Sequence, residues 1–171
     1  MRDSLDTMTM TSPDPNAGIS VGQPVPDLTL TDDQGADVAL RELRGKRVVL
    51  YFYPKDETPG CTTQACALRD SWRRFEAVED LVVYGVSPDG VTSHQTFRAA
   101  HDLPFHLLVD EDHRLADALG FWAEQVNDGR KYWGVERSTV IVGADGNIQS
   151  MVRKVRPAMH VDWLAVELGL A

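Results

Sequence analysis

Hydrophobic residues along this chain fall into short continuous runs that alternate with stretches of helical spacing. The runs at residues 47–53, 81–86 and 105–109 are mainly β-branched, other aliphatic and aromatic, which is typical of strands buried on both faces. The stretches with apolar residues three or four apart predict amphipathic helices, and they cover residues 61–78, 92–101 and 113–119, with Gly120 as a cap. Strands that alternate with helices indicate a parallel core sheet.

Hairpins are predicted at both ends of this alternation. Residues 28–31 and 36–40 flank the turn Asp32-Asp33-Gln34-Gly35, and residues 139–142 and 148–155 flank a turn at 144–147. A last helix is predicted at residues 161–168. The expected fold class is therefore α/β, with a mixed central sheet flanked by helices and an N-terminal hairpin extension. The first half of the predicted elements has the order βαβ and the second half has the order ββα. By analogy, this arrangement is similar to the thioredoxin-like fold.

Two stretches carry no regular pattern. Residues 1–20 are polar and lack apolar periodicity, so we predict a flexible tail, followed by a single domain over residues 21–171. Residues 121–136 are interpreted as a long loop. Its aromatic residues Trp122, Tyr132 and Trp133 are expected to pack against apolar neighbours rather than to wall a site or dock a partner.

Composition narrows the function classes. The chain has 171 residues, 43% of them hydrophobic, which is enough for one core. Its formal net charge of −9 would repel a phosphate backbone or an anionic bilayer, so nucleic acid and membranes are poor candidate partners. Because no long apolar run or signal-peptide pattern is present in the sequence, the expected location is the cytoplasm. The sequence leaves open whether the protein is a monomer or a homodimer.

Cys61 is the first candidate for chemistry. The chain has two cysteines, Cys61 and Cys66, which are too few for a disulfide scaffold. Cys61 follows the carboxyl end of a predicted central strand and begins a predicted helix, where unpaired N–H groups and the helix dipole favour a thiolate. The alternative is that Cys61 is simply a small buried hydrophobic residue.

Thr58 and Cys66 flank this position. The Thr58 hydroxyl could face the sulfur or a bound oxygen substrate, and it could also cap the helix. Cys66 follows five positions after Cys61, so on a regular helix their Cα atoms are about 8 to 9 Å apart. A disulfide needs about 7 Å or less, so a bond between them requires the first helical turns to unwind. The alternative for Cys66 is a packed core residue.

Arg137 precedes the predicted strand at residues 139–142. A guanidinium there could stabilise a thiolate and polarise a peroxide oxygen, although an arginine at a strand start is usually a solvated end residue. The five histidines are dispersed, without ligand spacing to either cysteine, and are interpreted as surface residues. We therefore predict no metal and no other cofactor.

Together these residues resemble a known family. Pro54-Lys-Asp-Glu-Thr58-Pro-Gly-Cys61 is similar to the Pro-x-x-x-Thr-x-x-Cys signature of peroxiredoxins. The position of Cys66 is similar to that in the bacterioferritin-comigratory or Q-type branch. Arg137-Ser138-Thr139 resembles the downstream arginine segment of the family. The resemblance covers residues 20–170, approximately.

The resemblance implies a role for each matching residue. Pro54 would shape and shield the site, Thr58 would orient the peroxide, and Arg137 would activate both peroxide and sulfur. Cys61 would be the peroxidatic thiolate that reduces hydrogen peroxide or an organic hydroperoxide. Cys66 would then resolve the sulfenic acid to an intramolecular disulfide, and thioredoxin or a similar dithiol protein would reduce it.

Gln64 departs from the family pattern, because relatives often carry a glutamate that holds the arginine. A neutral amide can accept a hydrogen bond from Arg137 but removes a charge partner, so the sequence leaves the positioning of Arg137 open. Two other functions also stay open. One is a thiol–disulfide reductase acting on proteins, although its usual Cys-x-x-Cys spacing is missing. The other is a peroxide-sensing redox switch, which would react once without turnover.

Overall fold

The computed structural model describes residues 19–170. The predicted tail therefore lies outside the described residues, apart from its last two. Of these, Ile19 packs against the core, and its backbone N–H donates to the carbonyl oxygen of Ala118 at 3.3 Å.

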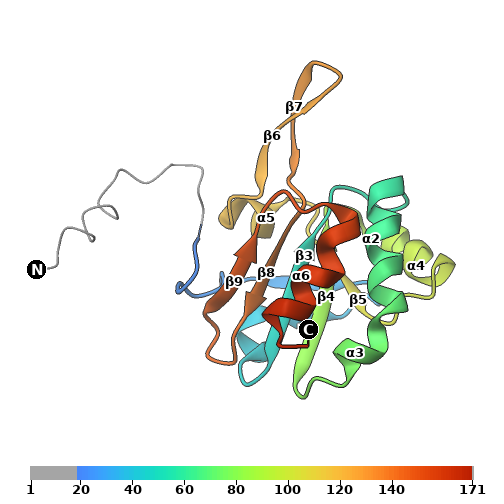
Figure 1. The fold of residues 1–171 in the computed structure, drawn as a ribbon. Coiled ribbons are helices and arrows are strands. Elements are labelled where there is room, and N and C mark those ends of the chain that lie inside the picture. Colours follow the sequence, from blue (N-terminus) through green and yellow to red (C-terminus); the bar gives the residue numbers. More distant parts are fainter. Residues whose placement is uncertain (1–18, 171) are drawn as a thin grey trace, which may run out of the picture.

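A seven-stranded mixed sheet forms the centre of the structure (Figure 1). In spatial order its strands are β2 (Asp37–Ala39), β1 (Thr29–Asp32), β5 (His106–Val109), β4 (Leu81–Ser87), β3 (Arg47–Phe52), β8 (Ser138–Val142) and β9 (Ile148–Val152). The central strands β3, β4 and β5 run parallel, and the other neighbours pair antiparallel. This topology confirms the expected parallel centre and the predicted hairpin at each end.

Helices cover both faces of the sheet because β3 is apolar on both sides. Its alternate residues Val49 and Tyr51 belong to one core cluster, and Leu50 and Phe52 belong to the other. The first cluster is covered by α2 (Pro59–Asp70), α3 (Trp72–Glu76), α4 (Val91–Ala100) and α6 (His160–Glu167). The second is covered by α5 (Arg114–Ala118) and the 3-10 helix η1 (Leu40–Leu43). A second 3-10 helix, η2 (Pro157–Met159), leads into α6.

The predicted glycine cap of α5 is confirmed. Gly120 has a φ of +81°, in the left-handed region that favours glycine. Its N–H donates to Asp117 at 3.0 Å, and the N–H of Phe121 donates to Ala116 at 2.8 Å. This pair of bonds is a Schellman motif, which satisfies carbonyls at the helix end.

The single helix predicted over residues 61–78 is wrong. Helix α2 ends at Asp70, Ser71 leaves helical geometry with φ −100° and ψ 9°, and α3 begins at Trp72. Just after the break, the Trp72 ring packs on Phe105, with 5.7 Å between ring centroids. This aromatic contact with a core residue accompanies the break between α2 and α3.

The loop predicted at residues 121–136 is also wrong. Strands β6 (Trp122–Asn127) and β7 (Arg130–Val135) pair antiparallel and form a hairpin that projects from the body of the molecule (Figure 1). The two turn residues between them, Asp128 and Gly129, have φ values of 52° and 76°. Positive φ at both positions is the signature of the type I′ turn, whose twist matches that of two-residue hairpins.

The aromatic residues of this hairpin have different environments. Trp122 stacks on the ring of His113, with 3.7 Å between ring centroids, so it packs as expected. Tyr132 and Trp133 are 49% and 55% exposed, because both faces of the projecting hairpin meet solvent at this point. The predicted hydrophobic packing is therefore wrong for these two residues.

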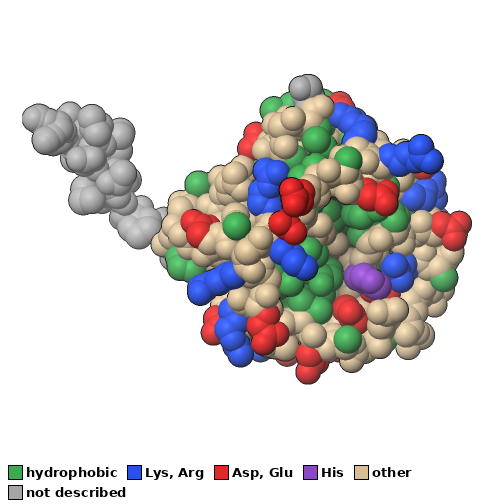
Figure 2. All heavy atoms as spheres, turned by 90° about the horizontal axis from the view of Figure 1, so that it is seen from below, with side chains coloured by type: hydrophobic (Ala, Val, Ile, Leu, Met, Phe, Trp, Pro, Cys, Tyr) green, Lys and Arg blue, Asp and Glu red, His purple; other side chains and the backbone are tan. Residues whose placement is uncertain are grey.

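Charged side chains are mixed on the molecular surface. On the face seen in Figure 2, basic and acidic side chains are interspersed around exposed hydrophobic ones, so the net charge of −9 is not gathered there into one acidic field. Within residues 19–170, none of the helices has both the length and the apolar composition needed to cross a membrane.

Candidate active site

The candidate nucleophile, Cys61, lies beyond the carboxyl end of the central strand β3. The chain leaves β3 after Phe52, crosses a short loop and enters α2, where Cys61 is the third residue. Pro59 occupies the first helical position, which suits a residue without an N–H. Thr58 is the N-cap, and its carbonyl oxygen accepts the first helical bond from Thr62 at 2.8 Å. The predicted strand before Cys61 is confirmed, and the helix begins at Pro59, two residues before the predicted start at Cys61.

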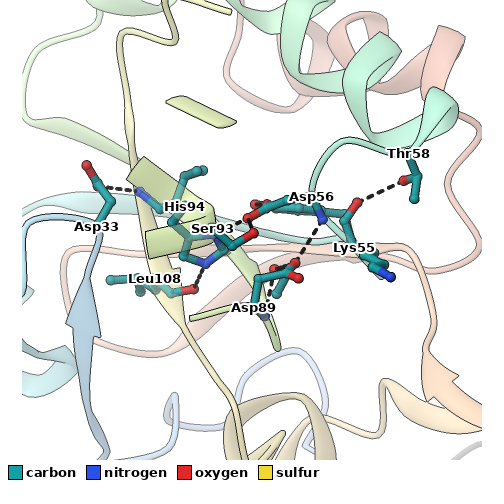
Figure 3. Close-up of polar contacts among 11 residues, drawn as sticks. Asp33, Lys55, Asp56, Thr58, Asp89, Ser93, His94 and Leu108 are labelled. Carbon is teal, nitrogen blue, oxygen red and sulfur yellow. Dashed lines mark hydrogen bonds and ion pairs between the residues drawn. The ribbon is translucent and has the colours of Figure 1, made fainter. Parts of the chain in front are cut away.

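The side chain of Thr58 closes the loop. Its hydroxyl donates to the carbonyl oxygen of Lys55 at 2.8 Å, and α2 has no side-chain cap (Figure 3). A hydroxyl can accept while it donates, so the Thr58 oxygen still has lone pairs for the O–H of a ligand. Pro54, at the start of the loop, is exposed.

Cys61 is buried and lies beside Arg137. The sulfur is the acceptor for Nη1 of Arg137 at 3.4 Å, while the cysteine as a whole is 1% exposed. The register of the sheet explains the contact, because Phe52 at the end of β3 pairs with Ser138 at the start of β8. Arg137, the residue before β8, is thereby held next to the loop that follows β3. The two predicted site residues are thus brought together by strand pairing.

Gln64 connects Arg137 to the protein interior. Nη1 of Arg137 donates to Oε1 of Gln64 at 2.7 Å, and Nε2 of Gln64 contacts Nδ1 of His160 at 3.1 Å. Nε2 of His160 in turn lies 2.9 Å from the hydroxyl of Thr139. Gln64, Thr139 and His160 are all fully buried. The amide therefore holds the guanidinium, which answers the question raised by the missing glutamate.

His160 contradicts the prediction that the histidines lie at the surface. Burial and the neighbouring charge of Arg137 lower its pKa from 6.5 to about 3, so its ring is neutral at physiological pH. A neutral ring has one donor and one acceptor nitrogen. Because the Gln64 amide donates to Nδ1, the proton lies on Nε2 and is donated to Thr139.

Asp56 holds the loop between β3 and α2 in place through hydrogen bonds of its side chain and backbone. Its buried carboxylate accepts a hydrogen bond from the hydroxyl of Tyr53 at 2.6 Å. It also accepts one from the hydroxyl of Ser93 at 2.8 Å, and it lies 2.7 Å from Nδ1 of His94 (Figure 3). Its backbone N–H donates to Asp89 at 2.8 Å. These bonds fix the backbone two residues before Thr58.

His94 is a second buried histidine that the surface interpretation missed. Its Nδ1 faces Asp56 and its Nε2 faces the carbonyl oxygen of Leu108 at 2.9 Å, so both nitrogens meet acceptors (Figure 3). Burial lowers its pKa, but the hydrogen bond to Asp56 and the charge of that carboxylate outweigh this, and the net shift is upward. Because a carboxylate and a carbonyl oxygen can only accept, both contacts favour the protonated ring, paired with Asp56.

Asp56 and His94 also belong to a group of side chains that could hold a metal ion. The side-chain ligand atoms of Asp56, Asp89 and His94 lie within 4.8 Å of one another. In this structure both ring nitrogens of His94 are engaged by protein acceptors and neither is left open to a metal. We therefore interpret the cluster as a structural support for the loop.

Cys66 lies on the same helix as Cys61, as expected, and both thiols are free in this structure. It is half-buried, whereas its neighbours Ala65 and Leu68 are fully buried. Its sulfur lies 3.8 Å from Nδ1 of His101. Cys66 is therefore at the margin of the core rather than inside it.

Comparisons of the sequence with known proteins identify the family of the chain. Residues 21–151 match the AhpC/TSA family. Peroxiredoxin Bcp of Bacillus subtilis is 48% identical over 143 residues, which is 84% of this chain and 90% of the relative. A putative peroxiredoxin of Mycobacterium tuberculosis, Rv2521, is 40% identical over 152 residues, covering 89% of this chain and 96% of the relative.

Solved structures give the same result. The bacterioferritin comigratory protein of Xanthomonas campestris, studied for alkyl peroxide reduction, has a TM-score of 0.80 at 33% identity and covers 88% of this chain and 98% of its own. BcpB of Mycobacterium tuberculosis has a TM-score of 0.76 at 28% identity, with coverages of 88% and 97%. These matches confirm the thioredoxin-like fold and the resemblance that the cysteine motif predicted. The chain therefore belongs to the AhpC/TSA family and is, like these relatives, a peroxiredoxin.

Proposed function

We propose that this thiol-dependent peroxidase reduces hydrogen peroxide and organic hydroperoxides with Cys61 as the attacking residue and Cys66 as the resolving residue. Thioredoxin, or a dithiol protein like it, is the proposed reductant. One observation carries the assignment: the Cys61 sulfur, in the first turn of α2, lies 3.4 Å from the guanidinium of Arg137. Both the fixed cation and the unpaired N–H groups of the helix start stabilise negative charge on sulfur.

In the first step the Cys61 thiolate attacks the terminal oxygen of the peroxide. The S–O bond forms as the O–O bond breaks, and the leaving alkoxide or hydroxide takes up a proton to give an alcohol or water. Arg137 stabilises the negative charge that shifts along the O–O bond. The Thr58 oxygen, which donates to Lys55, accepts the O–H of the substrate and so orients it.

In the second step the Cys66 thiolate attacks the sulfenic sulfur of Cys61. The S–S bond forms, the S–O bond breaks, and hydroxide leaves as water after taking up a proton. Both residues lie on α2, five positions apart, so the first turns of the helix must unwind to bring the sulfurs together. An external dithiol then reduces the disulfide and the helix re-forms.

Two substitutions test the assignment. Cys61→Ser is expected to abolish peroxide consumption, because the remaining thiol lacks the contact with Arg137. Cys66→Ser is expected to consume one equivalent of peroxide, to trap as a dimedone adduct at Cys61, and to lose turnover with thioredoxin and its reductase. A Cys61→Ser protein that consumes peroxide at the original rate would refute the mechanism. Wild-type protein that reacts once and does not turn over with any dithiol donor would instead point to a redox switch.

A further inference from the structure

A second chemical arrangement lies on the other side of α2. Cys66 is rotated from Cys61 by about 140° around the helix axis. Its sulfur lies 3.8 Å from Nδ1 of His101, and Nε2 of the same ring lies 3.0 Å from a carboxylate oxygen of Glu57. The thiol of Cys66 therefore contacts the imidazole of His101, and this imidazole contacts the carboxylate of Glu57. This order of groups activates nucleophiles in unrelated enzymes, because the imidazole takes the proton and the carboxylate holds the imidazole.

We propose that His101 is the general base for Cys66 and that Glu57 is the positioning residue that orients it. The proposal rests on the resolving role given to Cys66 above. The thiol proton of Cys66 passes to Nδ1 of His101, and the thiolate attacks the sulfenic sulfur of Cys61. The S–S bond forms as the S–O bond breaks, and the departing hydroxide takes up a proton from the imidazolium or from solvent to leave as water.

Glu57 decides which nitrogen of His101 is free to act. A carboxylate can only accept hydrogen bonds, so the ring nitrogen beside it, Nε2, carries a proton. In the neutral ring the lone pair then lies on Nδ1, which is the nitrogen that faces Cys66. The carboxylate thereby selects the tautomer that can accept the thiol proton, and it stabilises the imidazolium that results.

Packing holds the His101 ring in this orientation. His101 is the C-cap that follows α4, and its backbone carbonyl oxygen accepts a hydrogen bond at 2.7 Å from Nη1 of Arg69, one turn after Cys66 on α2. The ring meets Phe97 edge-on, with 5.2 Å between ring centroids. His101 is 24% exposed at its side chain, so it can exchange its proton with solvent between turnovers.

Other charged groups act on Cys66 from the elements around it. Arg69 on α2 has a raised pKa, chiefly because of its hydrogen bond to Asp70 and further because of charge at Cys66 and at Asp102, which follows α4. The Arg69 guanidinium is thus close enough to Cys66 for their charges to interact. Tyr51 of β3 also faces the two cysteines, and burial raises its pKa well above the usual range, so it stays neutral. The only imidazole in contact with the Cys66 sulfur among residues 19–170 is that of His101.

The contacts from Cys66 through His101 to Glu57 exist while α2 is still helical. Glu57 belongs to the loop before α2 and has a φ of 63°, in the left-handed region, so its placement against His101 depends on the folded loop. In the proposed sequence of steps, His101 therefore accepts the thiol proton of Cys66 before the helix unwinds.

The experiment uses the Cys61→Ser protein, in which Cys66 is the remaining thiol. Its alkylation by iodoacetamide is followed against pH, because the midpoint reports thiol acidity and the plateau at high pH reports access. We expect His101→Gln to raise the midpoint by about one pH unit and to slow alkylation near neutral pH about tenfold, with the plateau unchanged. Glu57→Gln is expected to raise the midpoint by a smaller amount.

His106→Gln is the matched control, because His106 is also partly exposed and also lies 3.0 Å from a carboxylate, that of Asp33. Its midpoint is expected to equal that of the Cys61→Ser parent. In the two-cysteine protein, His101→Gln is expected to slow disulfide formation at neutral pH, and the defect should disappear at high pH where Cys66 ionises unaided.

Two results separate the possible failures. An unchanged alkylation midpoint in His101→Gln would overturn the role of His101, whatever Cys66 does in turnover. Normal thioredoxin-linked turnover by Cys66→Ser would instead overturn the resolving role of Cys66, and the alkylation midpoints would still report the contact with His101.

Discussion

At the scale of single residues, Gln64 and His160 work as a pair. Since His160 is neutral and donates from Nε2 to Thr139, its Nδ1 can only accept. The amide nitrogen of Gln64 must face that acceptor, which turns the amide oxygen toward Arg137. A carboxylate at this position has no N–H to donate to Nδ1, so the glutamine and the histidine fit each other.

Substitution of Gln64 tests this orientation. Gln64→Leu removes both hydrogen bonds of the amide, and we expect the rate constant for Cys61 oxidation to fall about tenfold, since a hydrogen bond to a charged group contributes about 1.5 kcal/mol. Stopped-flow measurement of the first oxidation step checks this. Gln64→Glu keeps an acceptor for Arg137 and serves as the comparison. Equal oxidation rates in the leucine variant and wild type would show that the amide does not position the guanidinium.

The Asp56–His94 ion pair gives stability that depends on pH. The pKa of His94 is raised above 6.5 in the folded protein, so the folded state holds this proton more tightly than the unfolded state does. The contribution to the free energy of unfolding is therefore complete below the unfolded value and is lost as pH rises through the folded value. Urea unfolding of wild type at a series of pH values measures this loss.

The variant Asp56→Asn isolates the effect of the pair. It is expected to lower the free energy of unfolding by about 3 kcal/mol under mildly acidic conditions and to flatten the pH dependence that His94 causes. Parallel pH curves for wild type and Asp56→Asn would contradict the assignment of a charged His94.

At the scale of elements, the proposed resolving step predicts that the stability of α2 sets its rate. Thr63 lies between the two cysteines and is exposed, so it can be changed without disturbing the core. Alanine has a higher helix propensity than threonine, and glycine a lower one, with a difference of about 1 kcal/mol between alanine and glycine.

We therefore expect Thr63→Ala to slow disulfide formation and Thr63→Gly to speed it, with about a fivefold difference between the two variants. Rapid mixing with peroxide followed by acid quench and thiol counting measures the step. Oxidation of Cys61 is the internal control, since it takes place on the folded helix. Identical disulfide rates in both variants would mean that unwinding is not part of the step.

Elements with a single apolar face or a two-sided apolar run were predictable from sequence, and the exceptions have physical causes. The strands of the core and helix α4 follow from periodicity alone. The β6–β7 hairpin lacks one buried face, so its residues do not alternate, and only the Asp128-Gly129 pair carried a turn signal. The break at Ser71 coincides with a contact between Trp72 and Phe105, which are distant in sequence.

At the scale of the whole molecule, the site joins segments that the sequence keeps far apart. The residues from Pro54 to Cys66 form one local motif, and for that reason the sequence identified most of them. The contact between Gln64 and His160 spans 96 positions, and that between Asp56 and His94 spans 38. Neither histidine has a local pattern that distinguishes it from a surface residue, so only the folded chain reveals them.

The projecting hairpin gives a prediction for the molecule as a whole. Because Tyr132 and Trp133 are about half exposed, replacing both with serine should change the free energy of unfolding by less than about 0.5 kcal/mol. Chemical denaturation checks this, with Trp122→Ser as the comparison, since stacking of Trp122 on His113 ties the hairpin base to the body. A loss above about 1 kcal/mol for the Tyr132 and Trp133 double variant would mean that the hairpin packs on the body in solution.

Because both sulfurs lie on α2, the packing of this helix affects the reduction potential of the dithiol–disulfide couple. Packing of α2 stabilises the dithiol form, and the proposed disulfide form gives up part of that packing when the helix opens. Each kcal/mol lost in this way raises the reduction potential of the couple by about 20 mV. The proposed disulfide form is thereby expected to be a stronger oxidant than an unstrained disulfide, so that it accepts electrons from a donor more readily.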